Sequence, residues 1–263
     1  MTTHVINNLA VEVDGEGDAV LCIHGLGGSS NVWEPLLPAL QGCKVIRPDL
    51  PGSARSALPA EPLSIALYVA AMVGVLDELK VGKVHVLAHS MGTIVAQHLA
   101  EQHPERVLSL ALFGPLVAPP DAARPNIEAR ASAARGGISQ LQEIANAIVN
   151  GATSKQTKAS QPVTLALVRE SVMRQTPEGY AQSCEALARA QAAQLESIQA
   201  PVLLVTGDQD GVAPPASVEA MSGRLAHSRH VVVEGCGHWT TYEHPDRCVA
   251  ELQRFFQEFR VLA

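Results

Sequence analysis

Three side chains of this 263-residue sequence could together activate a nucleophile: Ser90, Asp210 and His238. A serine hydroxyl is a weak nucleophile until a base removes its proton, and a histidine base needs an acid that orients it and stabilises its positive charge. Each of the three residues follows a short apolar run that predicts a buried strand. We therefore expect them to meet at the carboxyl edge of a parallel sheet, where Ser90 attacks, His238 moves the proton and Asp210 orients His238.

The segment around Ser90 has small residues two positions before and two positions after the serine, Ala88 and Gly92. It follows the apolar run Val84–Ala88 and leads into Thr93–Leu99, which has helical spacing. A strand, a sharp turn and a helix with serine at the apex form the context of a nucleophile elbow. Ser90 could instead only cap the helix, but the flanking elements and the two partner residues favour the nucleophile.

Two aspartates compete for the acid position after the predicted strand Val202–Thr206. Asp208 comes first and is expected to brace the turn, so we favour Asp210. His238 is the histidine, among ten in the chain, that lies in a glycine-bracketed loop after the last predicted strand. We expect the other histidines to have structural or solvated positions.

Two backbone N–H groups are expected to bind the negative charge that develops on a substrate oxygen. One belongs to Met91, at the N-terminus of the helix that follows the serine. The other belongs to Leu26 in the loop His24–Gly27, which follows the apolar run Ala19–Ile23. His24 is expected to brace this loop rather than to take part in the chemistry.

Predicted strands and helices alternate along most of the chain, which favours an α/β fold with a doubly wound, mostly parallel sheet. The predicted strands are Val5–Val13, Ala19–Ile23, Lys44–Pro48, Val84–Ala88, Val107–Phe113, Val202–Thr206 and His230–Glu234. The predicted helices outside the central part of the chain are Trp33–Leu40, Ser64–Leu79, Thr93–Leu99, Ser217–Leu225 and Pro245–Arg260. From 117 to 199 only helix-like segments occur, which predicts an inserted helical cap on a core formed by 1–116 and 200–263.

Composition narrows the classes of partner and compartment. The formal net charge is −7 without basic clusters, which argues against nucleic acid and anionic membranes as partners. No apolar run reaches the roughly 18 residues of a spanning helix, and the N-terminus lacks the regions of a signal peptide. Five cysteines without close pairing indicate free thiols in a reducing compartment. We expect a cytoplasmic protein.

The absence of two sequence motifs argues against a bound cofactor or metal ion. The glycine-rich turn after the first apolar run lacks the G-x-G-x-x-G pattern of dinucleotide-binding proteins. The chain has no H-E-x-x-H or comparable set of metal ligands. We therefore expect neither a cofactor nor a metal ion.

Over essentially its whole length the chain resembles the serine-nucleophile branch of the α/β-hydrolase superfamily. The segments that carry the resemblance, in the order of that family, are the elbow Ala88–Gly92, the loop His24–Gly27, Gly207–Asp210 and Gly237-His238. The chain departs from the family pattern at three positions that usually hold glycine, namely Ala54, Ala88 and Thr93. A serine nucleophile argues against the haloalkane dehalogenase and epoxide hydrolase branches, which use aspartate.

Within the serine branch, the chain is similar to small carboxylesterases and to 3-oxoadipate enol-lactone hydrolases of bacterial aromatic catabolism. This resemblance implies a cofactor-independent serine hydrolase that cleaves a carboxylic ester or lactone of a small molecule through an acyl-enzyme. One alternative is a carbon–carbon bond hydrolase with the same triad. An alternative from another class is a ligand-binding receptor with incidental turnover.

Substrate choice is expected to depend on the cap, which would enclose the acyl group. Aromatic residues make up only 3% of the chain, so we expect aliphatic walls together with Met91 and Trp239. Arg55 on a core loop and Arg124 at the start of the cap are the nearest candidates to bind a substrate carboxylate, and Arg130 and Arg135 follow at helical spacing. Because arginine side chains are mostly exposed, we favour neutral esters.

Overall fold

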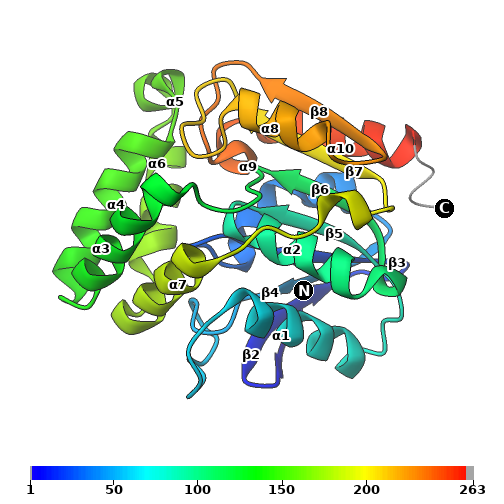
Figure 1. Cartoon of the computed structure of the whole chain (residues 1–263), viewed down its shortest axis with the longest axis horizontal. Coiled ribbons are helices and arrows are strands. Elements are labelled where there is room, and N and C mark those ends of the chain that lie inside the picture. The colour runs from blue at the N-terminus through cyan, green and yellow to red at the C-terminus, as the bar shows by residue number, and fades with distance from the viewer. Residues whose placement is uncertain (1, 259–263) are drawn as a thin grey trace.

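The computed structural model describes residues 2–258, and within them eight strands form one sheet in the order β1-β2-β4-β3-β5-β6-β7-β8 (Figure 1). The strands are β1 (Thr2–Ile6), β2 (Leu9–Asp14), β3 (Asp18–Ile23), β4 (Cys43–Pro48), β5 (Val84–His89), β6 (Val107–Phe113), β7 (Val202–Gly207) and β8 (Ser228–Val233). The β1–β2 and β2–β4 pairs are antiparallel and all other pairs are parallel. The predicted α/β fold with a mostly parallel sheet is confirmed.

The first predicted strand is wrong, because the segment Val5–Val13 folds as a hairpin rather than as one edge strand. Asn7 and Asn8 adopt φ values of 50° and 65° and turn the chain between β1 and β2. Asparagine tolerates this left-handed region better than most residues, and paired positive φ values suit a tight hairpin turn. The weak alternation of the segment therefore concealed a turn.

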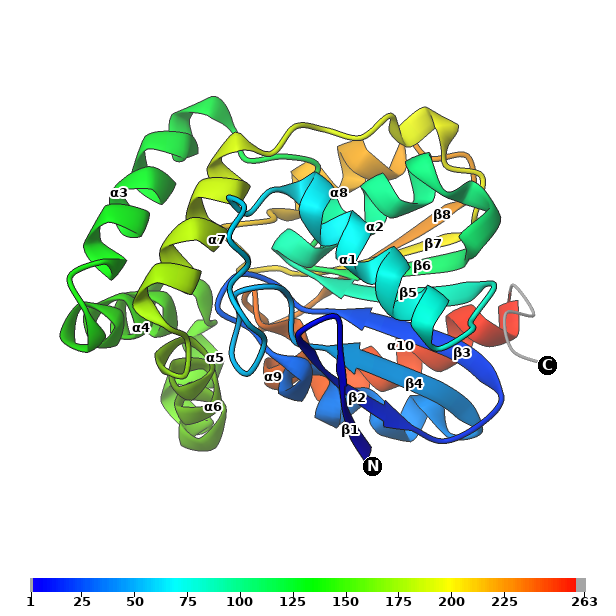
Figure 2. The same cartoon turned by 90° about the horizontal axis from the view of Figure 1, so that it is seen from below.

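Helices cover both faces of the sheet (Figure 2). One face packs against α1 (Ile65–Glu78), α2 (Met91–Gln102) and α8 (Pro215–Ser222). The opposite face packs against the 3₁₀ segment η1 (Ser30–Leu40), α9 (Thr240–Glu243) and α10 (Pro245–Glu258). Because helices lie on both sides, all six residues of β5 and all six of β7 are buried, which explains their continuous apolar runs.

The ends of several helices differ from their predicted positions. Ser64 caps α1 as expected, and its hydroxyl accepts a hydrogen bond from Leu67 N. The helical stretch predicted around residues 33–40 is a 3₁₀ helix, because Pro35 and Pro38 cannot donate backbone hydrogen bonds. The closing helix is described as far as Glu258, and the predicted end at Arg260 lies outside the described residues.

Between β6 and β7 the chain forms helices that lie together at one end of the sheet (Figures 1 and 2). We call α3 to α7 the cap helices. They are α3 (Arg124–Ala134), α4 (Ile138–Ala152), α5 (Lys155–Ser160), α6 (Pro162–Met173) and α7 (Pro177–Arg189). Short 3₁₀ turns flank them at Asp121–Ala123 and Leu195–Ser197, and a further one precedes β6 at Pro104–Arg106. Buried residues such as Leu141, Tyr180 and Cys184 form a small core between these helices.

All five cysteines are buried free thiols, in agreement with the predicted absence of disulfides. No helix within residues 2–258 has both the length and the apolar character that crossing a bilayer requires.

Candidate active site

Ser90 lies at the sharp turn between β5 and α2, with φ 53° and ψ −123°. A non-glycine residue in this sparsely populated region is strained, and such strain persists only where the surroundings hold it. Close packing here leaves no room for a side chain at two neighbouring glycines. A Cβ atom at Gly92 would lie 2.3 Å from the Ile23 carbonyl oxygen, and one at Gly25 would lie 2.7 Å from the Ser90 Cβ atom. The turn therefore fixes the serine hydroxyl above the carboxyl end of β5.

Thr93 replaces a glycine of the family pattern and has a structural use in this chain. Its hydroxyl donates a hydrogen bond to the Ser90 carbonyl oxygen at 2.6 Å and accepts one from Leu116 N at 3.0 Å. The side chain thus links the elbow to the segment that follows β6.

Ser90, His238 and Asp210 form one continuous hydrogen-bonded chain. His238 Nδ1 donates to Asp210 Oδ2 at 2.8 Å, and Ser90 Oγ donates to His238 Nε2 at 2.8 Å. A carboxylate on Nδ1 favours the tautomer whose Nε2 is free to accept a proton. The three residues follow β5, β7 and β8, and since these strands are parallel their carboxyl ends meet at one edge of the sheet.

The two competing aspartates have different contacts. Asp210 Oδ1 accepts hydrogen bonds from Val212 N and Ala213 N, both at 2.8 Å. Burial alone would raise the pKa of Asp210, but the charge and hydrogen bond of His238, together with these N–H groups, lower it to about 2. Asp208 instead accepts a hydrogen bond from Cys236 N at 3.1 Å and joins the two loops. Asp210 is therefore an ionised partner of His238, whereas Asp208 contacts only the backbone.

The two predicted oxyanion donors, the N–H groups of Leu26 and Met91, have no hydrogen-bond acceptor within residues 2–258. Met91 begins α2, so its N–H lies at the positive end of that helix. Leu26 lies in the turn after β3, and Gly27 supports that turn with φ 72°. Both donors are free to bind an anionic oxygen.

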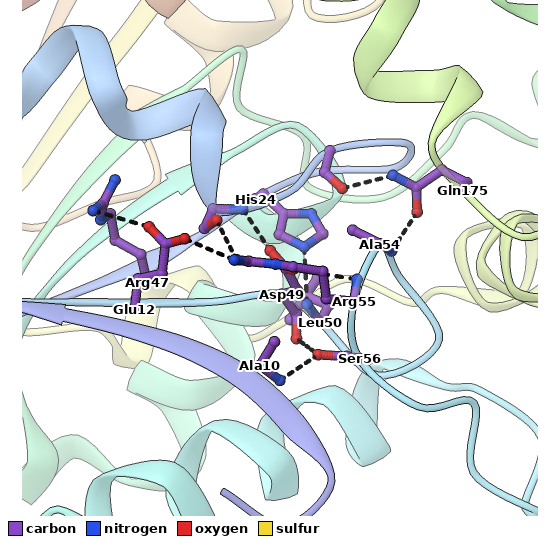
Figure 3. A network of polar contacts seen from close by, with 12 residues as sticks. Ala10, Glu12, His24, Arg47, Asp49, Leu50, Ala54, Arg55, Ser56 and Gln175 are labelled. Atoms are coloured by element: carbon purple, nitrogen blue, oxygen red, sulfur yellow. Dashed lines mark hydrogen bonds and ion pairs between the residues drawn. The ribbon is translucent and has the colours of Figure 1, made fainter. Parts of the chain in front are cut away.

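A polar network lies beneath the loop 24–30 (Figure 3). His24 Nδ1 donates to the Gly25 carbonyl oxygen at 2.8 Å, and His24 Nε2 accepts from Leu50 N at 2.9 Å. Asp49 Oδ1 accepts from Ser30 N at 2.7 Å. Burial lowers the pKa of His24, which keeps the ring neutral. His24 braces the loop, as its position in the sequence predicts.

Arg55 belongs to this network and not to a substrate pocket, so its predicted role in binding substrate is wrong. Figure 3 shows it between Asp49 and Glu12, with hydrogen bonds of 2.7 Å from Nε and 2.8 Å from Nη1. Its Nη2 atom donates to Ser30 Oγ at 2.8 Å. The physical reason is that buried Asp49 and Glu12 need a cation, and Arg55 supplies it.

Arg124 is also engaged elsewhere, so the same prediction is wrong for this residue. Its guanidinium donates to the carbonyl oxygens of Ala188 and Ala190 and pairs with Asp121. These contacts tie the start of α3 to the end of α7, because the last carbonyls of a helix need donors from outside the helix.

The cap helices are hydrogen-bonded to the loops at the sheet edge. Gln175, just after α6, donates from Nε2 to the Gly28 carbonyl oxygen at 3.0 Å and accepts from Ala54 N at 2.9 Å. Ser171 donates to the Gly27 carbonyl oxygen at 2.8 Å. Ala54 adopts φ 47°, a conformation that glycine favours, which accounts for the glycine at this position in the family pattern.

A cavity of about 310 Å³ opens over Ser90 and His238. Its other lining residues are Leu26, His89, Leu116, Arg130, Ile144, Ala147, Ile148, Gly151, Ala152, Leu187, Val212 and Trp239. The walls are mostly aliphatic and Trp239 is among them, as predicted. The Met91 side chain is not, because it packs fully buried in the core. Arg130 is the one lysine, arginine or acidic side chain among these described lining residues.

His89 is a second buried imidazole beside the site that sequence reasoning did not assign. Its Nε2 atom donates to the His238 carbonyl oxygen at 2.9 Å, and its ring lies 5.1 Å from that of His238 and 5.3 Å from that of Trp239. Burial and the neighbouring His238 lower the pKa of His89 to about 3. His89 is therefore neutral and positions the His238 loop.

Glu243 is a second residue that sequence reasoning missed. This buried carboxylate accepts hydrogen bonds from the N–H groups on both sides of His238, at 3.0 Å from Gly237 and 3.1 Å from Trp239. It also accepts from Ser154 N and Thr157 Oγ1, each at 2.8 Å. One carboxylate thus joins the His238 loop to the start of α5. No local pattern marks such a residue, since its partners are distant in sequence.

Other chemistry has little support at this site. Burial raises the pKa of the Cys236 thiol, which therefore stays protonated beside the His238 loop. Residues 2–258 hold no group of three or more His, Cys, Asp or Glu side chains suited to a metal ion. The predicted independence of metal ions stays a prediction.

Comparisons with known proteins identify the family of the chain. The family model for the alpha/beta hydrolase fold matches residues 18–245. The chain is 30% identical to a pimeloyl-[acyl-carrier protein] methyl ester esterase of Neisseria meningitidis serogroup B over 255 residues, which cover 91% of this chain and 92% of the relative. It is 28% identical to 3-oxoadipate enol-lactonase 2 of Acinetobacter baylyi over 243 residues, covering 90% and 88%.

Solved structures share the fold. A thermophilic esterase from Thermogutta terrifontis superposes with a TM-score of 0.90 at 24% identity, covering 98% of both chains. The enol-lactonase of Burkholderia xenovorans superposes with a TM-score of 0.88 at 23% identity, covering 97% of this chain and 100% of that chain. At these identities the likeness establishes the architecture alone.

Proposed function

This chain belongs to the α/β-hydrolase family, and we propose that it hydrolyses carboxylic esters of small molecules through an acyl-enzyme formed on Ser90. The observation that carries the proposal is the hydrogen-bonded chain from Ser90 through His238 to Asp210. Ser90 and His238 line a cavity whose walls are mostly aliphatic. The similarity over nearly the whole chain to an enzyme named as a methyl ester esterase supports the same chemistry.

In the first half-reaction, Ser90 Oγ attacks the ester carbonyl carbon while His238 Nε2 takes the hydroxyl proton. The N–H groups of Leu26 and Met91 bind the oxyanion of the tetrahedral intermediate, and preorganised donors of this kind contribute several kcal/mol to lowering such barriers. His238 then donates the proton to the leaving alcohol. Asp210, whose pKa is lowered to about 2, stays ionised throughout and stabilises the imidazolium.

In the second half-reaction, water takes the place of the alcohol. His238 removes a proton from the water, which attacks the acyl carbon, and the same two N–H groups bind the second oxyanion. Collapse of this intermediate releases the carboxylic acid and returns the proton to Ser90. Besides the ester and water, the proposed cycle calls on Ser90, His238, Asp210 and the two backbone N–H groups.

A second candidate function is hydrolysis of an enol-lactone, which is a cyclic ester and needs the same steps. The similarity to the enol-lactonase of Acinetobacter baylyi over 90% of the chain favours this candidate. Opening a lactone differs from ester cleavage in one respect, because the leaving oxygen stays attached to the acyl group.

The test combines a nucleophile variant with a substrate panel. Ser90→Ala should lower kcat by about 10⁶-fold for every ester that the wild type cleaves, because a triad acts as a unit. A fluorophosphonate should modify Ser90 in the wild type, as peptide mass spectrometry would show. A folded variant that keeps a tenth of the activity would remove Ser90 from the mechanism.

The panel should contain short-chain p-nitrophenyl esters, enol-lactones and vinylogous diketones. Turnover of esters or lactones agrees with the proposal, and the faster of the two identifies the substrate class. Exclusive turnover of the diketones would assign carbon–carbon bond hydrolysis instead. Tight binding of a panel member without turnover would favour the receptor alternative.

A further inference from the structure

Arg130 is the unusual residue of the cavity wall. It lies on α3, half-buried, among lining residues that are mostly aliphatic. It forms no ion pair with any carboxylate in the described part of the chain. By contrast, Arg55, Arg124 and Arg135 each pair with at least one acidic side chain.

Two ionisable side chains that interact with Arg130 do not supply a negative charge. These are the Tyr180 phenol and the Cys184 thiol, both buried. Burial raises the pKa of Cys184 to about 12 and also raises the pKa of Tyr180, although the positive charge of Arg130 acts in the opposite direction on both. Both groups are therefore neutral at physiological pH, so neither of them neutralises the charge of Arg130.

A guanidinium on an aliphatic wall favours one class of ligand. A carboxylate carries a single negative charge and matches the guanidinium in two parallel hydrogen bonds. A phosphate dianion would bring a second charge that nothing else in the described wall could neutralise, at a cost of several kcal/mol. An acyl chain that ends in a methyl group would leave the guanidinium without an anionic partner.

We propose that the cavity binds esters whose acyl chain ends in a carboxylate, with the ester group at Ser90 and the carboxylate at Arg130. This inference rests on the proposed ester hydrolysis and names its substrate class as half-esters of dicarboxylic acids. Ser90 follows β5 at the sheet edge and Arg130 belongs to α3 in the cap (Figure 2), so the aliphatic wall between them holds the methylene chain. The proposal departs from the expectation of neutral esters, because the cap holds an arginine without an acidic partner at the cavity.

The experiment measures kcat/KM for matched pairs of p-nitrophenyl esters. The two acids of each pair have the same chain length and end in a carboxylate or a methyl group, and several chain lengths are compared. The wild type should prefer the carboxylate ester at one chain length. Arg130→Gln should lower kcat/KM for that ester by about 10- to 100-fold, the usual effect of losing a hydrogen bond to a charged group. For the methyl-terminated ester, kcat/KM should change by less than about threefold.

Two further variants sharpen the result. Arg130→Lys keeps the charge without the planar fork and should recover part of the preference. Arg135→Gln is the matched control, since this arginine follows α3 directly, is exposed and pairs with Glu178 and Glu185. It should keep the wild-type preference. The proposal is overturned if the wild type prefers the methyl-terminated ester, or if Arg130→Gln lowers kcat/KM equally for both esters.

A binding measurement separates this inference from the proposed function. Calorimetry with the Ser90→Ala protein should show tighter binding of the carboxylate-terminated ester than of the methyl-terminated ester. Arg130→Gln in the same background should remove the difference in affinity. If no ester is cleaved but this difference in binding is present, the proposed hydrolysis fails and the assignment of Arg130 stands. If esters are cleaved without any difference, the assignment of Arg130 fails and the hydrolysis stands.

Discussion

The two sides of Ser90 hold their positive charges in opposite ways. Beneath the loop 24–30, Arg47 is completely buried and Arg55 is partly buried, and both are surrounded by acidic side chains. Their partners are Glu12, Asp14, Glu34 and Asp49. On the cap side, Arg130 lies at a mostly aliphatic cavity and pairs with none of the described carboxylates.

This difference separates charges that fix the structure from charges that are available to a ligand. A buried ion pair rarely adds net stability over apolar packing, but removing one partner is costly because the other is left alone. A network of this kind therefore holds the loop 24–30 in one conformation. A guanidinium without an acidic partner contributes no such rigidity, and its charge gains an ion pair only when an anion binds.

The largest effect in this comparison concerns two carboxylates, Asp210 and Asp208. Asp210 contacts the histidine of the site, whereas Asp208 accepts a hydrogen bond from a backbone N–H group. Asp210→Asn should lower kcat by about 10⁴-fold, because an amide on His238 Nδ1 allows the wrong tautomer and no longer stabilises the imidazolium. Asp208→Asn should cost less than about tenfold, since the amide oxygen can still accept the hydrogen bond from Cys236 N. Steady-state kinetics with one activated ester measures both. The reverse ranking would make Asp208 the acid.

The next prediction compares how Arg47 and Arg130 contribute to the free energy of unfolding. Arg47→Met should lower the free energy of unfolding by about 3–5 kcal/mol, because it removes a fully buried cation that pairs with Glu12, Asp14 and Glu34 and leaves buried Glu12 with Arg55 alone among the described cations. Arg130→Met should change that free energy by less than about 1 kcal/mol, since no ion pair is lost. Urea unfolding followed by circular dichroism measures the two values. Equal losses would mean that Arg130 also fixes the fold.

A third effect tests the carboxylate that joins the His238 loop to the cap. Glu243→Gln should lower kcat by about 10- to 100-fold. Both oxygens of the Glu243 carboxylate accept hydrogen bonds from backbone N–H groups, so the NH₂ group of glutamine would face an N–H donor in place of one of these oxygens. KM should change much less, since Glu243 does not line the cavity. Thr157→Val removes the hydroxyl contact to Glu243, together with the hydrogen bond from Ser154 Oγ, but leaves the N–H groups of Gly237 and Trp239 on Glu243, so it is the matched control. A rise in KM at unchanged kcat would assign Glu243 to the cap alone.

Most of the fold, and the meeting of Ser90, His238 and Asp210 at one edge of the sheet, could be predicted because they depend on local patterns. Strand and helix periodicities identify β3 to β8 within a few residues, and the small residues around Ser90 mark its turn. The preference for Asp210 over Asp208 also needed only their order after β7. The paired positive φ values at Asn7 and Asn8 were missed, because the hydrophobic pattern continues across that turn.

The orientation of single side chains could not be predicted, because it depends on partners far away in the sequence. Arg55, Arg124 and Arg130 have similar local surroundings in the sequence. Arg55 is engaged by a residue 43 positions away, at Glu12, and Arg124 by the end of α7. Arg130 alone of the three lines the cavity, and it does so from α3, which packs against α7.

The smallest effect concerns stability toward acid on the His238 side of the site. Burial lowers the pKa of His89 from 6.5 to about 3, so an unfolded chain binds a proton there at a pH where the folded chain does not. The contribution of His89 to stability is therefore complete above about pH 6.5 and is lost as the pH falls toward 3. Between about pH 7 and pH 5.5 the loss should be about 1 kcal/mol.

His89→Gln tests this contribution, because glutamine can donate to the His238 carbonyl oxygen but does not titrate. The variant should lose about 1 kcal/mol less than the wild type between about pH 7 and pH 5.5, measured by urea unfolding at each pH. His230→Gln, at an exposed histidine of β8, is the control and should follow the wild type. His24 also has a lowered pKa and keeps its contribution in every variant, so the slope of His89→Gln should decrease without vanishing. An unchanged slope would mean that His89 is protonated in the folded protein, which would place a second cation beside His238 and weaken its action as a base.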